Sequence, residues 1–182
     1  MALQGRKVLI TRLLKNKDAR PAVVSGYHPV EGNKRCFMNS YEAVFMKEDF
    51  GYDIAETPMA EKHLTELMYK HLPEGTKSMS DATHWSGAEE VEIDLADLEE
   101  FIAHHGGRRH IDPGLCYKIQ SGRYYDPILL YDMIHLIPRE TVSFFGKVTA
   151  YHLRDSSSWL WFYNSDGESG VLVQKNPFAK KK

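Results

Sequence analysis

Cysteine is scarce in this chain of 182 residues, and long apolar runs are missing. The two cysteines, Cys36 and Cys116, lie far apart and form no CxxC pair, which excludes a disulfide framework. This usage is typical of a reducing compartment, so we expect a cytoplasmic protein. No segment approaches the roughly 20 consecutive apolar residues that a membrane-spanning helix needs. We therefore expect no membrane association.

The usual enzyme signatures are also missing. The chain has no GxGxxG fingerprint, no P-loop, no HExxH pair and no GxSxG elbow, so no motif identifies an enzyme. We accordingly assign no catalytic residue, expect no cofactor, and regard an enzyme as less favoured than a binding protein. Repeats, low-complexity tracts and Pro- or Ser-rich linkers are absent as well. One α+β domain over residues 1–182 is expected.

Charge is present in quantity and is unevenly distributed. The formal net charge is only −2. However, residues 1–35 carry +6, residues 36–100 carry −12 and residues 101–182 carry +4. An acidic middle therefore lies between two basic ends.

The apolar pattern predicts an α+β fold, with two helices packed on a mainly antiparallel sheet that ends in a C-terminal β-meander. The helices are expected over 57–75 and from a cap at Asp94 through 105. Tryptophan, leucine and phenylalanine make both faces of 158–163 apolar, which predicts a central strand. A tight hairpin turn is predicted at Asp166 and Gly167. The segments predicted as strands are 6–14, 21–27, 36–46, 126–138, 142–153, 158–163 and 170–175.

The stretch HHGGRRH, residues 104–110, has two interpretations. Histidines in the last turn of a helix and a glycine directly after it are typical of a helix C-terminus. Alternatively, His104, His105 and His110 are zinc ligands together with Cys116. Adjacent histidines on a helix diverge by about 100°, which favours the structural interpretation.

The segment AEEVEIDLADLEE, residues 88–100, contains seven acids and no base. Carboxylates spaced along a strand and into a helix can imitate the phosphates of a nucleic-acid backbone, and such a surface is attracted to cationic grooves. If EEVEID is extended, Glu90 and Glu92 share one face, while Val91 and Ile93 share the other. The alternative is that the acids only solvate the domain. The candidate partner-binding acids are Glu89, Glu90, Glu92, Asp94, Asp97, Glu99 and Glu100.

A basic segment follows directly, GGRRHIDPGLCYKIQSGRYY, residues 106–125. Basic side chains interleaved with tyrosines can hold phosphates and stack on bases. Arg108, Arg109, Lys118 and Arg123 are therefore candidates for contact with nucleic acid, and the three arginines belong to the candidate partner-binding set. The alternative is a solvated pair of strands.

Two other functions remain open. A small cytosolic transferase or hydrolase acting on a nucleotide-like substrate would use His110 or His135 as base, with Arg108 or Arg123 on a phosphate. A direct nucleic-acid binder would require the two basic ends of the chain to converge on one surface.

The acidic EEVEIDLADLEE, the basic RRHIDPGLCYK and the lack of catalytic motifs together resemble type II anti-CRISPR proteins. These are inhibitors of the Cas9 nuclease carried by phages and mobile elements. The resemblance implies direct binding to Cas9 or its guide-RNA complex, with target engagement or cleavage blocked. It also implies a place in the cytoplasm of a host bacterium.

Overall fold

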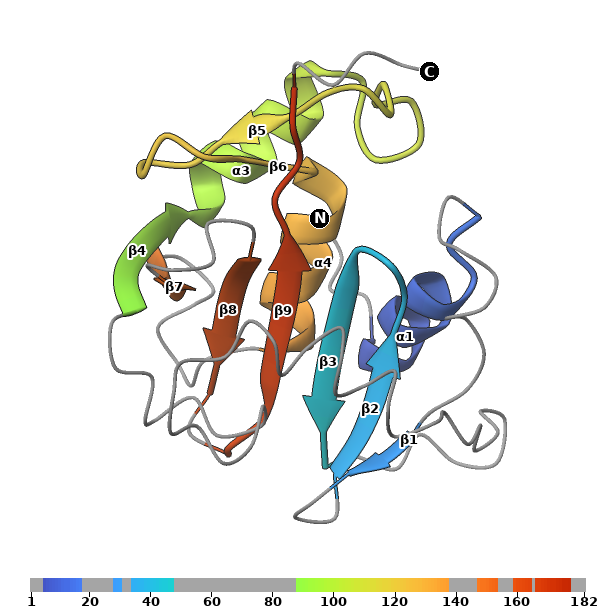
Figure 1. The fold of residues 1–182 in the computed structure, drawn as a ribbon. Helices are drawn as coiled ribbons and strands as arrows, with labels where there is room; N and C mark the ends of the chain where they lie inside the picture. The colour runs from blue at the N-terminus through green and yellow to red at the C-terminus, as the bar shows by residue number, and fades with distance from the viewer. Residues whose placement is uncertain are drawn as a thin grey trace.

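The computed structural model describes residues 5–17, 28–30, 34–47, 88–137, 147–153, 159–164 and 166–177. The predicted helix over 57–75 and the predicted strand over 21–27 lie outside these residues, as do 142–146 of a third predicted segment. Figure 1 shows the arrangement of the elements. They are α1 (Arg6–Leu14), β1 (His28–Val30), β2 (Lys34–Met38), β3 (Glu42–Met46), β4 (Ala88–Asp94), α3 (Leu95–His104), β5 (Tyr117–Lys118), β6 (Tyr124–Tyr125), α4 (Pro127–Leu136), β7 (Lys147–Leu153), β8 (Trp159–Tyr163) and β9 (Ser169–Val173).

The described strands form a seven-stranded sheet in the order β1-β2-β3-β9-β8-β7-β4, together with a small β5-β6 hairpin. Each pair of neighbours is antiparallel. This confirms the predicted α+β class, the antiparallel sheet and the C-terminal meander β7-β8-β9. It also places β8 in the interior of the sheet, where Leu160, Trp161 and Phe162 are all buried. None of the described helices combines the length and apolarity needed to cross a membrane.

The segment 6–14, predicted as a strand, is helix α1, so that prediction was wrong. Leu9, Ile10 and Leu13 are buried, and this spacing places them on one face of a helix. A strand would have put Val8 and Ile10 on the same face, whereas Val8 is 52% exposed and Ile10 is fully buried. The β-branched residues suggested a strand, but the order of the apolar residues fits only a helix.

The segment 126–138 was also wrongly predicted as a strand, since it forms helix α4. The Asp126 carboxylate accepts from the amides of Ile128 and Leu129 at 2.9 and 3.2 Å, and Pro127 occupies the first turn. This Asp-Pro pair is a helix start signal. It was obscured because α4 is buried almost all round and so shows no polar stripe.

The segment 36–46, predicted as one strand, is a hairpin of β2 and β3. Asn39 makes the turn: its side-chain oxygen accepts from the amides of Tyr41 and Glu42 at 2.8 and 3.0 Å. The same side chain donates to the carbonyl of Leu13 at 2.9 Å, which ties the turn to the end of α1. An asparagine that hydrogen-bonds its own backbone two residues on is a turn former.

Helices α1, α3 and α4 share one core with the sheet. The core includes Leu13 from α1, Ile102 from α3, Met133 from α4 and Phe162 from β8. In Figure 1, α4 lies behind β9 and α1 lies beside β2. The chain passes directly from β4 into α3, so the acidic segment spans the end strand of the sheet and the helix that follows it.

Candidate interaction surface

The predicted extended conformation of EEVEID is confirmed by β4. Val91 and Ile93 are 6% and 1% exposed, whereas the side chains of Glu90 and Glu92 are exposed. The alternation follows from the strand, in which successive side chains point to opposite faces. Glu89 also lies in β4, but its side chain is outside the described residues. The strand thus buries one face in the core and presents carboxylates on the other.

The predicted cap at Asp94 is confirmed as well. Its carboxylate accepts from the amides of Ala96 and Asp97 at 3.0 and 3.2 Å. Leu95, Leu98 and Ile102 form the buried face of α3. The capping carboxylate satisfies amides that the first turn leaves without partners, and it lies at the positive end of the helix dipole.

One further acid of α3 is held by a tyrosine hydroxyl. Tyr117 donates to the Asp97 carboxylate at 2.5 Å. Burial raises the pKa of Tyr117, and the hydrogen bond to Asp97 raises it further. The phenol therefore stays neutral, and it orients the Asp97 carboxylate without cancelling its charge.

The acids differ in how far they are available to a partner. Among the described contacts, no hydrogen bond or ion pair involves the exposed carboxylates of Glu90 and Glu100. Glu92 is exposed beside Glu90. Asp97 is exposed although Tyr117 holds it, while Asp94 and Glu99 are half-buried. We define the acidic surface as Glu90, Glu92, Asp97 and Glu100.

Arg108 does not lie with the other basic candidates. Its guanidinium forms an ion pair with the buried Asp132 and lies over the ring of Tyr131, 4.7 Å from its centroid. Arg12 contacts the same carboxylate at 2.5 Å. Asp132 thus holds two guanidiniums, which links α1 and the loop after α3 to α4. A charge held in this way contributes to the fold.

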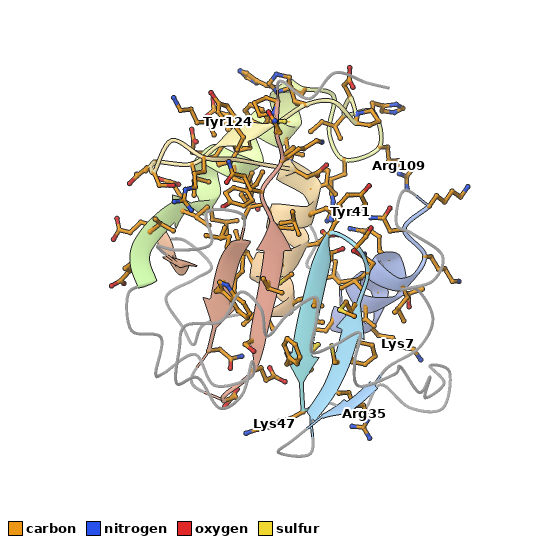
Figure 2. All side chains as sticks on the ribbon, in the orientation of Figure 1. Lys7, Arg35, Tyr41, Lys47, Arg109 and Tyr124 are labelled. Atoms are coloured by element: carbon orange, nitrogen blue, oxygen red, sulfur yellow. The ribbon has the colours of Figure 1, made fainter. Side chains whose placement is uncertain are left out.

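The other basic candidates are spread over the end of the molecule near α3. Arg109 and Lys118 are exposed, and the Lys118 ammonium lies 5.8 Å from the ring centroid of Tyr124. Arg123 is half-buried and hydrogen-bonds Tyr125. In the view of Figure 2, Arg109 lies on the side nearer α1, and Tyr124 lies on the side nearer β4.

The histidines after α3 follow the helix-end interpretation. Gly106 has φ +88° directly after the helix, as the left-handed residue of a helix C-terminus does. His105 Nδ1 donates to the carbonyl of Phe101 at 2.8 Å, and the centroids of the two rings lie 4.3 Å apart. Within the described ranges, no group of three or more His, Cys, Asp or Glu side chains is placed to hold a metal. His104, His110 and Cys116 are therefore not brought together with His105 as ligands.

The structure does bring two residues of the enzyme alternative together. His135 and Arg108 both pack on the ring of Tyr131; the imidazole centroid lies 4.1 Å away. His135 Nδ1 donates to the Tyr131 carbonyl at 2.7 Å, which leaves Nε2 as the accepting nitrogen. Burial lowers the pKa of His135, so the ring is neutral at neutral pH.

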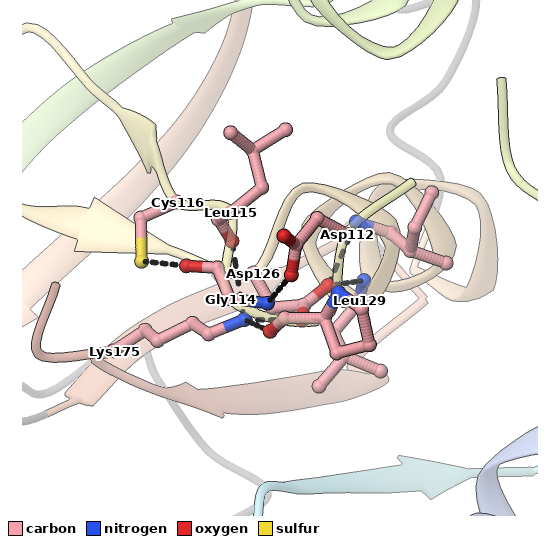
Figure 3. Close-up of polar contacts among 9 residues, drawn as sticks. Asp112, Gly114, Leu115, Cys116, Asp126, Leu129 and Lys175 are labelled. Carbon is pink, nitrogen blue, oxygen red and sulfur yellow. Dashed lines mark hydrogen bonds and ion pairs between the residues drawn. The ribbon is translucent and has the colours of Figure 1, made fainter. Parts of the chain in front are cut away.

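Sequence reasoning missed Lys175, whose ammonium joins three segments (Figure 3). It donates to the carbonyls of Pro113 and Leu115 at 2.5 and 3.1 Å and to the Asp126 carboxylate at 3.0 Å. All three of its protons have acceptors. These hydrogen bonds fix the basic segment, residues 106–125, against the start of α4. No sequence signal predicts it, because its partners lie 49 to 62 residues away.

In comparisons with known proteins, no protein-family model, curated protein or solved structure matches the chain.

Proposed function

We propose that the protein is an interaction protein that inhibits a nucleic-acid-processing nuclease by occupying its cationic nucleic-acid-binding groove with the acidic surface. The observation that carries this proposal is the set of exposed carboxylates that continues from β4 into α3. Asp97 is oriented by a neutral hydroxyl, and Glu90 and Glu100 have no partner among the described residues.

A carboxylate that is already oriented, as Asp97 is by Tyr117, meets a cationic groove at a lower entropic cost than a flexible side chain does. Charge complementarity also accelerates encounter and fixes the register of the complex. The partner that we propose is a Cas9-type effector with its guide RNA, whose heteroduplex channel is positively charged. Arg109, Lys118 and Arg123 lie beyond the end of α3, and they are proposed contacts to guide or target strand at the rim of the complex.

The test is binding to a purified Cas9-type effector loaded with guide RNA. Glu90→Lys combined with Glu100→Lys should weaken binding at least about tenfold at low salt, and wild-type binding should weaken as salt rises. Glu90→Lys and Glu100→Lys are also made singly. The affinity of each is compared with that of Asp166→Lys, which makes the same charge change at an exposed residue of the β8–β9 turn. Equal affinity of wild type and double variant at low salt would contradict the proposal. Binding of the protein alone to nonspecific duplex DNA in a gel-shift assay would also contradict the proposal, because the acidic surface should repel DNA.

A second candidate function is a transferase or hydrolase on a nucleotide-like substrate, and the packing of His135 and Arg108 on Tyr131 favours it. The Arg108–Asp132 ion pair weakens this candidate, because a phosphate would have to compete with the carboxylate of Asp132 for the guanidinium. Glu90→Lys and Glu100→Lys leave the cluster of His135, Arg108 and Tyr131 intact. They should therefore weaken binding to the nuclease but leave a transferase or hydrolase activity unchanged, which separates the two functions.

A further inference from the structure

Among the strands that the structure describes, β4 stands at one end of the sheet. All seven of its residues, Ala88–Asp94, pair antiparallel with β7. Alternate backbone groups of a strand point to opposite sides within the plane of the sheet. Half of the amides and carbonyls of β4 therefore point away from β7, along the outer edge visible in Figure 1.

The side chains on this strand determine which strands could pair with that edge. Glu90 and Glu92 are exposed on one face, and Val91 and Ile93 anchor the strand to the core on the other. An exposed edge is a template for pairing with another chain, and charged side chains control which chain pairs.

A second copy of this chain is a poor occupant of the edge. If two β4 strands paired, they would bring glutamates against glutamates, and like charges directly opposite each other destabilise a sheet. A strand with lysine or arginine at alternate positions would place ammonium or guanidinium groups against Glu90 and Glu92. The same charges thus reject self-pairing and favour a basic partner.

We propose that β4 is a docking edge for an extended basic segment of the partner protein, which adds to the sheet as a further strand beside β4. Backbone hydrogen bonds supply affinity in this mode, and alternate side chains supply specificity. This inference rests on the proposed function, since it specifies how a cationic partner engages the acidic surface.

The test uses the full chain and a labelled peptide as long as β4, with lysine at alternate positions and valine or threonine between them. A second peptide has the same sequence and charge, but its backbone nitrogens are methylated on the pairing side, so they cannot donate. Fluorescence anisotropy gives both affinities, and amide hydrogen exchange gives the residues protected by the peptide.

The unmethylated peptide should bind at least about tenfold more tightly than its methylated analogue, because the methylated peptide forfeits two or more hydrogen bonds. It should slow exchange at β4 amides in preference to those of α3. Glu90→Lys with Glu92→Lys should abolish its binding, whereas Asp166→Lys should not. The comparison of the two peptides uses only wild-type protein, so it is independent of how the variants fold.

Equal binding of the two peptides would overturn strand addition and leave the electrostatic surface of the proposed function intact. Failure of both peptides to bind, or protection confined to α3, would also overturn it. If the peptides behave as expected and the Cas9-type effector does not bind, the docking edge stands and the proposed nuclease partner is wrong.

Discussion

At the scale of single residues, Glu42 is a carboxyl group buried in the β2–β3 hairpin. It is 3% exposed. Its Oε1 accepts from Asn39 at 3.2 Å, while Oε2 has no hydrogen-bond partner among the described residues. Burial raises the pKa of Glu42 to about 7, and the nearby Asp126 carboxylate acts in the same direction. Asn39 and Arg12 oppose the shift. The folded protein therefore holds a proton on Glu42 that the unfolded chain releases near its ordinary pKa.

This proton makes stability depend on pH. Between the unfolded pKa near 4.5 and the folded value of about 7, the folded state binds more protons, so the free energy of unfolding falls as pH rises. The loss is about 3 kcal/mol across that window and levels off above it. Glu42→Gln cannot ionise, and its amide replaces the protonated acid.

Urea denaturation of wild type and Glu42→Gln at pH 5 and pH 8 checks this prediction. The variant should lose less stability than wild type between the two pH values. The exposed Glu100→Gln should keep the wild-type slope. Parallel pH profiles for wild type and Glu42→Gln would show that Glu42 is ionised in the folded protein throughout this range.

At the scale of elements, the β4–α3 junction depends on one carboxylate with two properties. Asp94 ends the strand and caps the helix through the amides of Ala96 and Asp97. Its hydrogen-bonding geometry stabilises α3, while its charge adds to that of the acidic segment 88–100. These two contributions are separable by substitution.

Asp94→Ala should lower the free energy of unfolding by about 1 kcal/mol, because the cap is lost and the amides return to water. Asp94→Asn removes the charge but keeps a capping oxygen, and asparagine is about as good a cap as aspartate. It should therefore stay close to wild type. Chemical denaturation of the three proteins measures the difference. Equal losses in both variants would mean that charge, not capping geometry, holds the helix start.

At the scale of the whole molecule, α4 packs directly on the sheet because β9 has a glycine beneath it. Added to Gly170, a Cβ would overlap the Met133 Sδ and lie 3.1 Å from Ile137 and 3.4 Å from Val44. Met133 is fully buried and Ile137 is 2% exposed, so neither has open space to move into. The close approach of α4 to β9 thus requires the missing side chain.

Gly170→Ala should destabilise the protein by about 1–3 kcal/mol through overpacking. Gly5→Ala is its control for crowding, because a Cβ at Gly5 has nothing within 4 Å. Gly5 is the N-cap of α1, so this variant loses only the difference between a glycine and an alanine cap. Thermal unfolding of both variants measures the effect: Tm should fall further for Gly170→Ala than for Gly5→Ala. An unchanged Tm for Gly170→Ala would show that α4 shifts freely on the sheet.

Local patterns predicted the elements whose geometry depends on neighbouring residues. The alternation in EEVEID, the Asp94 cap, the left-handed Gly106 and the Asp166-Gly167 turn are all present. Each depends on residues at most a few positions apart, so the sequence alone determines it.

Tertiary structure decided what depends on distant residues. It decided that Pro127–Leu136 is a helix. A segment buried almost all round carries no polar stripe that marks a helical period, so its sequence pattern did not show this. Tertiary structure turned Arg108 inward, because Asp132 lies 24 positions further along the chain. It also placed β4 beyond β7 at the end of the sheet. Strand order and ion pairing require contacts between segments far apart in the chain, and apolar periodicity does not specify which distant segments meet.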